Sequence, residues 1–327
     1  EKAYLGKIGA EYMHLHDRDT CNWIRNKIEL RQFNEVTTEE RDRMLDRTLW
    51  TDEFSSFIGT KFNTMKRFGL EGCESMIPGM KAAMDTCREN GGEKATIGMP
   101  HRGRLSLLAN VIRKPLETIF AEFQGVTPTD KDHDSHSGDV KYHLGTNFTK
   151  TYPDGKQFTV EVLANPSHLE CINPVVMGRV RAENHIRNTK GGKTNRTKNI
   201  PFLIHGDASF AGQGVVYESL QMANLKNYTV GGTIHIICNN QIGFTTNPSK
   251  ARSGHYSSDL VKAINAPIFH VNAQSVEDVC FVFKLAAEYR QKFEKDVVID
   301  LIGYRKFGHN ELDQPSFTQP LMYQQVA

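Results

Sequence analysis

The clearest hydrophobic pattern lies in the middle of the chain. A short apolar run, residues 200–205, stops at Asp207, and a second run, residues 233–238, stops at Asn240. Between them, residues 212–226 place apolar side chains on one side of a predicted helix. A pair of parallel strands joined by a crossover helix needs about 30 residues. The pattern therefore predicts a strand–helix–strand unit in which Asp207 and Asn240 follow neighbouring parallel strands.

Similar patterns flank this unit and predict an α/β protein. Further strands are predicted at 94–99, 158–164, 267–271 and 297–304, the last buried on both faces because it is almost continuously apolar. Further helices are predicted at 74–88, 105–112, 174–187 and 276–293. We expect a doubly wound, mostly parallel sheet spanning residues 61–327. Residues 1–60 are predicted to be a helical lead-in, with Thr37 to Glu40 as a helix start.

Several strands of the predicted sheet end in residues that bind anions or cations. In open α/β sheets, ligands bind at the carboxyl ends of the strands. One carboxylate (Asp207), one amide oxygen (Asn240) and main-chain carbonyls form the oxygen set that Mg²⁺ takes when it holds a diphosphate. Arg102 and Arg104 follow another strand and suit bidentate contacts to anions, or else belong to a solvated basic turn. His309 follows a fourth strand and joins the same edge.

The remaining candidate motifs are weaker. His143 and His168 lie in or after turns, where a single histidine is usually ordinary surface. His133 and His136 have a spacing compatible with metal binding, but their loop is rich in Asp, Ser and Lys, which favours solvation. The segment 191–194 (GGKT) lacks the full phosphate-loop pattern after a strand and is interpreted as a solvated basic loop.

Composition excludes some classes of function. The net charge of +2 over 327 residues is too small to indicate nucleic-acid binding by itself, although the basic residues between 179 and 198 leave that alternative open. No apolar run reaches the roughly 18–20 residues of a membrane span, so no membrane partner is expected. The six cysteines are scattered without a CxxC pair, which indicates a reducing compartment and neither a disulfide framework nor a zinc site.

A resemblance to a known family joins these features. Gly206-Asp207 and Asn239-Asn240, each after a strand and about thirty residues apart, are typical of thiamine diphosphate enzymes. The surrounding segments closely resemble the decarboxylating first component of 2-oxoglutarate dehydrogenase complexes: MPHRGRLS (99–106), GDVKYHLG (138–145), NPSHLE (165–170), HGDASFAGQG (205–214), NNQIGFTT (239–246) and YRKFGHNELDQPSFTQP (304–320). One departure is Pro78-Gly79, which interrupts the predicted helix 74–88.

The resemblance implies roles for residues at these positions. It implies a Mg²⁺ site formed by Asp207, Asn240 and the main-chain oxygen of Ile242. It implies that the diphosphate side of thiamine diphosphate is held by Arg102, Gly206, Asp207, Ala208 and Ser209. It implies that the substrate is reached by His101 and His143, and that the same pocket is lined by His168 and His309.

The resemblance also implies an activity and partners. The expected reaction is oxidative decarboxylation of 2-oxoglutarate in the tricarboxylic acid cycle, with transfer of the succinyl group to the lipoyl domain of dihydrolipoyl succinyltransferase. The alternatives are a 2-oxoadipate dehydrogenase component and a non-catalytic assembly module of the same fold. We expect a homodimer in the mitochondrial matrix, or in the cytoplasm if the source is bacterial. We also expect this chain to be a piece of a longer protein, whose activating glutamate lies in a further domain supplied by the other subunit.

Overall fold

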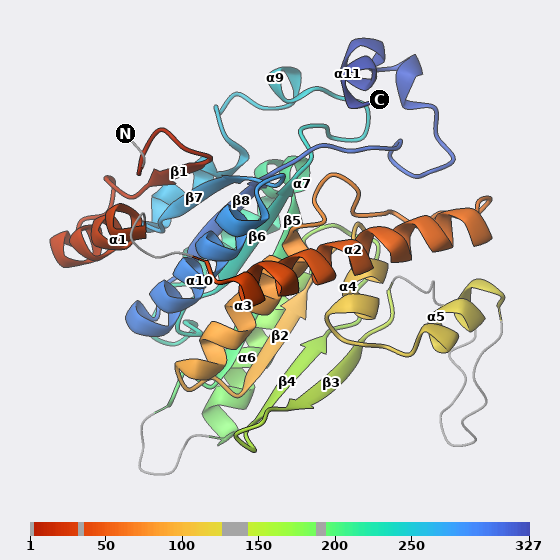
Figure 1. Cartoon of the computed structure of the whole chain (residues 1–327). Helices are drawn as coiled ribbons and strands as arrows, with labels where there is room; N and C mark the ends of the chain where they lie inside the picture. Colours follow the sequence, from red (N-terminus) through yellow and green to blue (C-terminus); the bar gives the residue numbers. More distant parts are fainter. Residues whose placement is uncertain (1–2, 32–35, 126–142, 188–193) are drawn as a thin grey trace.

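An eight-stranded mixed sheet organises the part of the chain that the computed structural model describes, residues 3–31, 36–125, 143–187 and 194–327 (Figure 1). The order of the strands is β1-β7-β8-β6-β5-β2-β4-β3. The inner strands are parallel, whereas β1 and β3 run antiparallel to their neighbours at the two edges. The strands are β1 (Ile8–Glu11), β2 (Lys94–Gly98), β3 (Thr146–Thr151), β4 (Gln157–Val162), β5 (Asn199–Gly206), β6 (Ile234–Asn239), β7 (Ile268–Asn272) and β8 (Val297–Ile302).

Helices cover both faces of the sheet, which confirms the doubly wound α/β prediction. Helices α3 and α10 pack together on one face, and α6 packs against β5 and β2 on the other (Figure 1). Successive residues of β6 face opposite layers. Ile236 belongs to the hydrophobic cluster that includes α3 and α10, whereas Ile237 belongs to the cluster that includes α7 and α8. The helices are α1 (Arg18–Leu30), α2 (Thr38–Lys61), α3 (Met76–Glu89), α4 (Arg104–Asn110), α5 (Leu116–Phe123), α6 (Ile172–Arg187), α7 (Asp207–Gly212), α8 (Gly214–Met222), α9 (Pro248–Ala251), α10 (Val276–Phe293) and α11 (Pro320–Val326), with short 3₁₀ turns η2 (Ser257–Ile264) and η3 (Pro315–Phe317).

The amino-terminal segment differs from the prediction in two respects. Helices α1 and α2 are present, and Thr37 caps α2 through a capping box with Glu40. However, β1 joins the edge of the main sheet by pairing with β7, so residues 1–60 are not a purely helical lead-in. Helix α2 also runs across the boundary placed between residues 60 and 61. No helix in the described ranges is long and apolar enough to cross a membrane.

The connection after β5 is also different from the prediction. Helix α7 begins at Asp207 itself, directly after the strand, and a break at Gln213 separates α7 from α8. The expected turn at Gly206-Asp207 is therefore a direct strand-to-helix junction. An acidic residue in the first turn of a helix is favourable, and Gly206 supplies the extended N-cap.

The Pro78-Gly79 pair does not disrupt α3. Pro78 lies in the first turn, where its missing N–H group has no intrahelical partner to lose. A Cβ at Gly79 would lie 2.9 Å from the Phe283 ring of α10. The glycine therefore permits the close packing of α3 against α10.

Candidate functional site

The loops after β2, β5, β6 and β8 meet around a cavity of about 100 Å³ at the carboxyl edge of the sheet. Their convergence follows from the parallel order, because β2, β5, β6 and β8 are consecutive neighbours. Every residue that was predicted to bind the cofactor lines this cavity, together with His101 and His309. The structure thus brings together Arg102, Gly206, Asp207, Ala208, Ser209, Asn240 and Ile242.

Two turns that carry the predicted metal ligands approach each other closely at this edge. A Cβ added at Gly243 would lie 2.6 Å from the Cβ of Ala208, so the two backbones approach at a distance that only glycine permits at position 243. Asp207 precedes Ala208, and Asn240 and Ile242 precede Gly243. The three predicted ligands therefore lie on two adjoining turns.

Asp207 is the charged member of this ligand set. It is 3% exposed, and burial raises the pKa of its carboxyl to about 6, although Arg252 at 3.6 Å opposes the shift. A bound cation would favour the ionised form. No cluster of three or more His, Cys, Asp or Glu side chains suited to a metal occurs in the described ranges. A single carboxylate with amide and carbonyl oxygens suits Mg²⁺ that receives its remaining ligands from phosphate and water.

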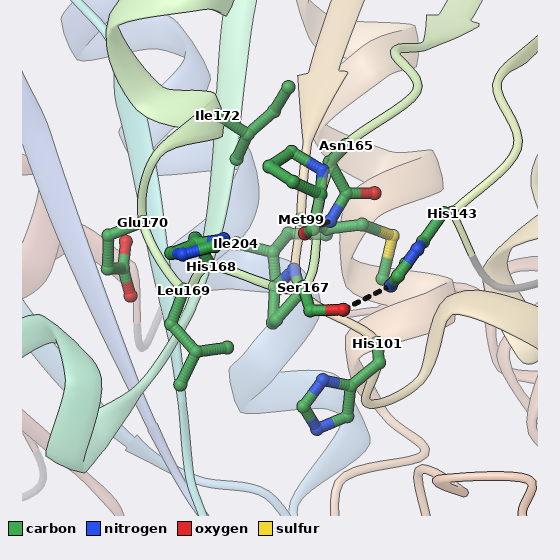
Figure 2. Close-up of a pocket in the computed structure, with 12 residues that line it drawn as sticks. Met99, His101, His143, Asn165, Ser167, His168, Leu169, Glu170, Ile172 and Ile204 are labelled. Atoms are coloured by element: carbon green, nitrogen blue, oxygen red, sulfur yellow. Dashed lines mark hydrogen bonds between the residues drawn. The ribbon is translucent and has the colours of Figure 1, made fainter. Parts of the chain in front are cut away.

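The four predicted histidines surround two adjoining cavities. His309 lines the larger one, His143 and His168 line a smaller one of about 10 Å³, and His101 borders both. The Nε2 atom of His143 lies 3.3 Å from the hydroxyl of Ser167 (Figure 2). His168 is exposed, and in Figure 2 its ring is turned away from His143.

His101 is neutral in this environment. Burial lowers its pKa to about 4, and the positive charge of Arg102 adds to the effect. Burial and the charges of Arg102 and Arg305 also lower the pKa of His309. Neutral imidazoles can each donate one hydrogen bond and accept another.

The two arginines after β2 have different environments. Arg102 lines the larger cavity and donates hydrogen bonds to the carbonyls of Gly69 (3.2 Å) and His309 (2.6 Å). Arg104 is fully buried and donates to the carbonyls of Met99, Leu144 and Leu163. The prediction that Arg104 meets an anion, and the alternative of a solvated turn, are both wrong for this residue, because the side chain is buried and both Nη atoms donate to carbonyls inside the fold.

Residues 46–327 match the family described as "Dehydrogenase E1 component". The chain belongs to this dehydrogenase E1 component family. It is 52% identical over all 327 residues to the mitochondrial 2-oxoglutarate dehydrogenase of Dictyostelium discoideum and 53% identical to that of Saccharomyces cerevisiae. It is 50% identical to a mitochondrial 2-oxoglutarate dehydrogenase-like protein of Xenopus laevis. The chain spans about a third of the length of these curated relatives (32%, 32% and 31%).

Several residues at this site were not predicted. Arg305 lines the larger cavity and donates to the carbonyl of Phe244, and Arg252 pairs with Asp207. Glu170 lines the smaller cavity and accepts hydrogen bonds from His205 and Ser209. Glu170 ends the NPSHLE segment beside His168, a signal that could have marked it. Arg252 has no comparable signal, because its partner lies 45 positions away.

The other sequence candidates have structural partners or lie outside the described residues. His133, His136 and most of the segment 191–194 lie outside them, as do Lys190 and Lys193 of the basic cluster. The following side chains of that cluster contact groups of the same chain: Arg179 pairs with Glu183 and Glu161, Arg181 donates to the carbonyl of Thr229, Arg196 pairs with Glu294, and Lys198 pairs with Glu93.

Proposed function

We propose that this chain contains the diphosphate-binding half of a thiamine-diphosphate-dependent 2-oxoglutarate dehydrogenase. The observation that carries the proposal is the close approach of the Asp207 turn to the Asn240–Gly243 turn, beside a cavity bordered by histidines. The names of the relatives, which match along the whole chain, support the choice of reaction. Fold alone would not, because one fold hosts many chemistries.

The residues of the larger cavity suit the cofactor's magnesium diphosphate. Asp207, Asn240 and the main-chain oxygen of Ile242 would hold Mg²⁺. Arg102, Gly206, Ala208 and Ser209 would face the diphosphate. When bound, thiamine diphosphate supplies the carbon nucleophile and the electron sink that decarboxylation of a 2-oxo acid requires.

The histidines would act on the substrate. His101 is neutral, so its single N–H group can donate a hydrogen bond to a substrate carboxylate while its other ring nitrogen remains an acceptor. An anionic substrate would raise its pKa by offsetting the repulsion from Arg102, which would allow His101 to take up a proton during the reaction. His143 would contribute a second contact to the substrate, and His168 and His309 would line the pocket around it.

The full-length protein would pass the succinyl group to the lipoyl domain of dihydrolipoyl succinyltransferase. It would act as a homodimer in the tricarboxylic acid cycle. Its place would be the mitochondrial matrix, which the word "mitochondrial" in the names of the relatives supports. The glutamate that activates the cofactor's aminopyrimidine would come from another part of the full-length protein.

Calorimetric titration of the full-length protein with thiamine diphosphate and Mg²⁺ tests this proposal. We expect binding by the wild type and a loss of at least about 100-fold in affinity for Asp207→Ala, because the carboxylate ligand is removed. Asp154→Ala is the control, since Asp154 lies in an exposed turn and pairs with Arg88 away from the site. No binding by the wild type, or equal affinity in Asp207→Ala, would refute the proposal.

A rate assay with two acids decides the substrate. The full-length protein should give the higher kcat/KM with 2-oxoglutarate. Preference for 2-oxoadipate would indicate the alternative dehydrogenase, since one methylene is worth only about 1–3 kcal/mol in a pocket. Cofactor binding without turnover of either acid, in the presence of the lipoyl partner, would indicate a non-catalytic module.

A further inference from the structure

Glu170 is a buried carboxylate that joins two parts of the proposed site. Its side chain is 3% exposed. One oxygen, Oε1, accepts a hydrogen bond from the Ser209 hydroxyl at 2.6 Å. The other, Oε2, lies 2.6 Å from Nδ1 of His205 and accepts from the amide of Asn173 at 2.8 Å. A buried charge requires such partners, and these three bonds satisfy both carboxylate oxygens.

Two of these partners, His205 and Ser209, lie on either side of the strand-to-helix junction that carries Asp207. His205 lies near the end of β5, and Ser209 lies in the first turn of α7. The segment between them is Gly206, Asp207 and Ala208. A single carboxylate therefore holds both ends of the junction, yet Glu170 is not itself among the residues that line the larger cavity.

The main chain of Glu170 belongs to the loop that carries His168. Residue 165 of this loop donates its N–H to the carbonyl of His143 at 3.1 Å, and Ser167 contacts the His143 ring (Figure 2). Glu170 has φ +70, which is costly for a residue other than glycine. The hydrogen bonds of its carboxylate explain why this conformation persists. Glu170 thus ties the loop of His143 and His168 to the junction of Asp207.

The connection continues on the far side of His205. Its Nε2 lies 3.1 Å from Nδ1 of His235, and Nε2 of His235 lies 3.1 Å from a carboxylate oxygen of Asp296. Both rings are buried, and Phe210 packs against His205 with ring centroids 4.6 Å apart. These contacts restrict the ring of His205. Because Glu170 contacts the other side of this ring, it also helps to hold the end of β5 in place.

We propose that Glu170 is a positioning residue that sets the junction carrying Asp207 and couples it to the histidine loop. This inference rests on the proposed function, because it assigns that junction to magnesium diphosphate. Glu170 acts through His205 and Ser209. Its removal should therefore weaken cofactor binding and loosen both segments together.

The test uses the full-length protein and the variant Glu170→Gln, which keeps the size of the side chain. We expect the Kd for thiamine diphosphate with Mg²⁺ to rise by about 10–100-fold, the range typical for loss of a residue that supports a metal site from outside its ligand set. We also expect faster amide hydrogen exchange in residues 165–170 and 205–209, a readout that does not depend on activity.

Glu183→Gln is the matched control. Glu183 lies on α6, the helix that follows the loop of Glu170, and it accepts hydrogen bonds from Lys94, Arg179 and Asn199. However, Asn199 begins β5 at the end opposite to Asp207. We expect its Kd to stay within about twofold of the wild type, with no faster exchange in either segment. An equal loss of affinity in Glu183→Gln would overturn the inference, because it would show a general effect of instability.

A second variant keeps the test decisive if Glu170→Gln does not fold. Asn173→Ala removes a donor to Glu170, and Asn173 is among the lining residues of neither cavity. We expect its Kd to rise by about 3–10-fold. Unchanged affinity in the folded variants, with intact binding by the wild type, would overturn the inference alone. Absence of binding by the wild type would instead overturn the proposed function and this inference with it.

Discussion

Gly243 occupies the point where the two turns with the proposed magnesium ligands come closest. A Cβ at position 243 would lie 2.6 Å from the Cβ of Ala208, whereas ordinary van der Waals contact begins at 3.4 Å. Gly243→Ala must therefore separate the turns by about 0.8 Å, the difference between these two distances. Gly243 does not have a positive φ, so the effect of the substitution is steric and involves no strain of the left-handed region.

This displacement is large for a metal site. Metal–ligand distances vary by only about 0.2 Å, and a misplacement of about 1 Å in an active site costs on the order of 100-fold. We expect the Kd for thiamine diphosphate with Mg²⁺ to rise by about 10–100-fold in full-length Gly243→Ala, measured by calorimetric titration. Overpacking should also lower the free energy of unfolding by about 1–3 kcal/mol.

Two further variants separate the clash from a general loss of stability. Gly178→Ala adds a Cβ to an exposed position of α6 with no atom within 4 Å, and it should leave the Kd unchanged while stabilising the helix by up to about 1 kcal/mol. Ala208→Gly removes the atom that a Cβ at position 243 would strike, so the double variant should recover most of the affinity. Wild-type affinity in Gly243→Ala, or no recovery in the double variant, would refute this reasoning.

Three other predictions concern ionisable side chains. Arg104→Met should lower the free energy of unfolding in urea by about 3–5 kcal/mol, because it leaves buried carbonyls without their donor, whereas Arg41→Met, at an exposed ion pair, should cost less than about 1 kcal/mol. Against the effect of burial, hydrogen bonds to two carboxylates raise the pKa of His270. The contribution of His270 to stability should be complete below its unfolded pKa of about 6.5 and should be lost as the pH rises through the raised folded value. Urea denaturation of wild type and His270→Gln from about pH 6 upward measures this contribution. A difference in unfolding free energy that stays constant with pH would contradict the prediction. His101→Gln should raise KM yet keep the shape of the wild-type profile of kcat/KM between about pH 5 and pH 8, because the pKa of His101 lies near 4; loss of a titration from that range would show that His101 is charged.

The parts of the fold that the sequence predicts well carry strong local patterns. Helix α10 has the predicted bounds, 276 to 293, because its apolar positions repeat with the period of a helix over eighteen residues. Strands β5 and β6 are continuous apolar runs. In contrast, β1 is a four-residue strand with a glycine and a glutamate, and it exists because it pairs with β7 some 260 positions away. Local pattern carries no information about such a partner.

The candidate site divides along the same line. The place of Asp207, Asn240 and His309 follows from the rule that parallel strands end at one edge, and that rule needs only local pattern. The contacts of Glu170 with His205 and Ser209 join residues 35 and 39 positions apart. Those contacts form because the fold buries the three side chains together, and the spacing of the residues along the chain does not indicate this burial.

Arg102 and Arg104 show the limit most directly. They are two positions apart in the same turn, and Gly103 between them adopts a left-handed conformation with φ +75. That turn leaves Arg102 beside the cavity and makes Arg104 the first residue of α4, inside the fold. The carbonyls that hold Arg104 come partly from residues 144 and 163, which are 40 and 59 positions away. Whether a cation at a strand end meets a ligand therefore depends on distant segments that use its donors or leave them available.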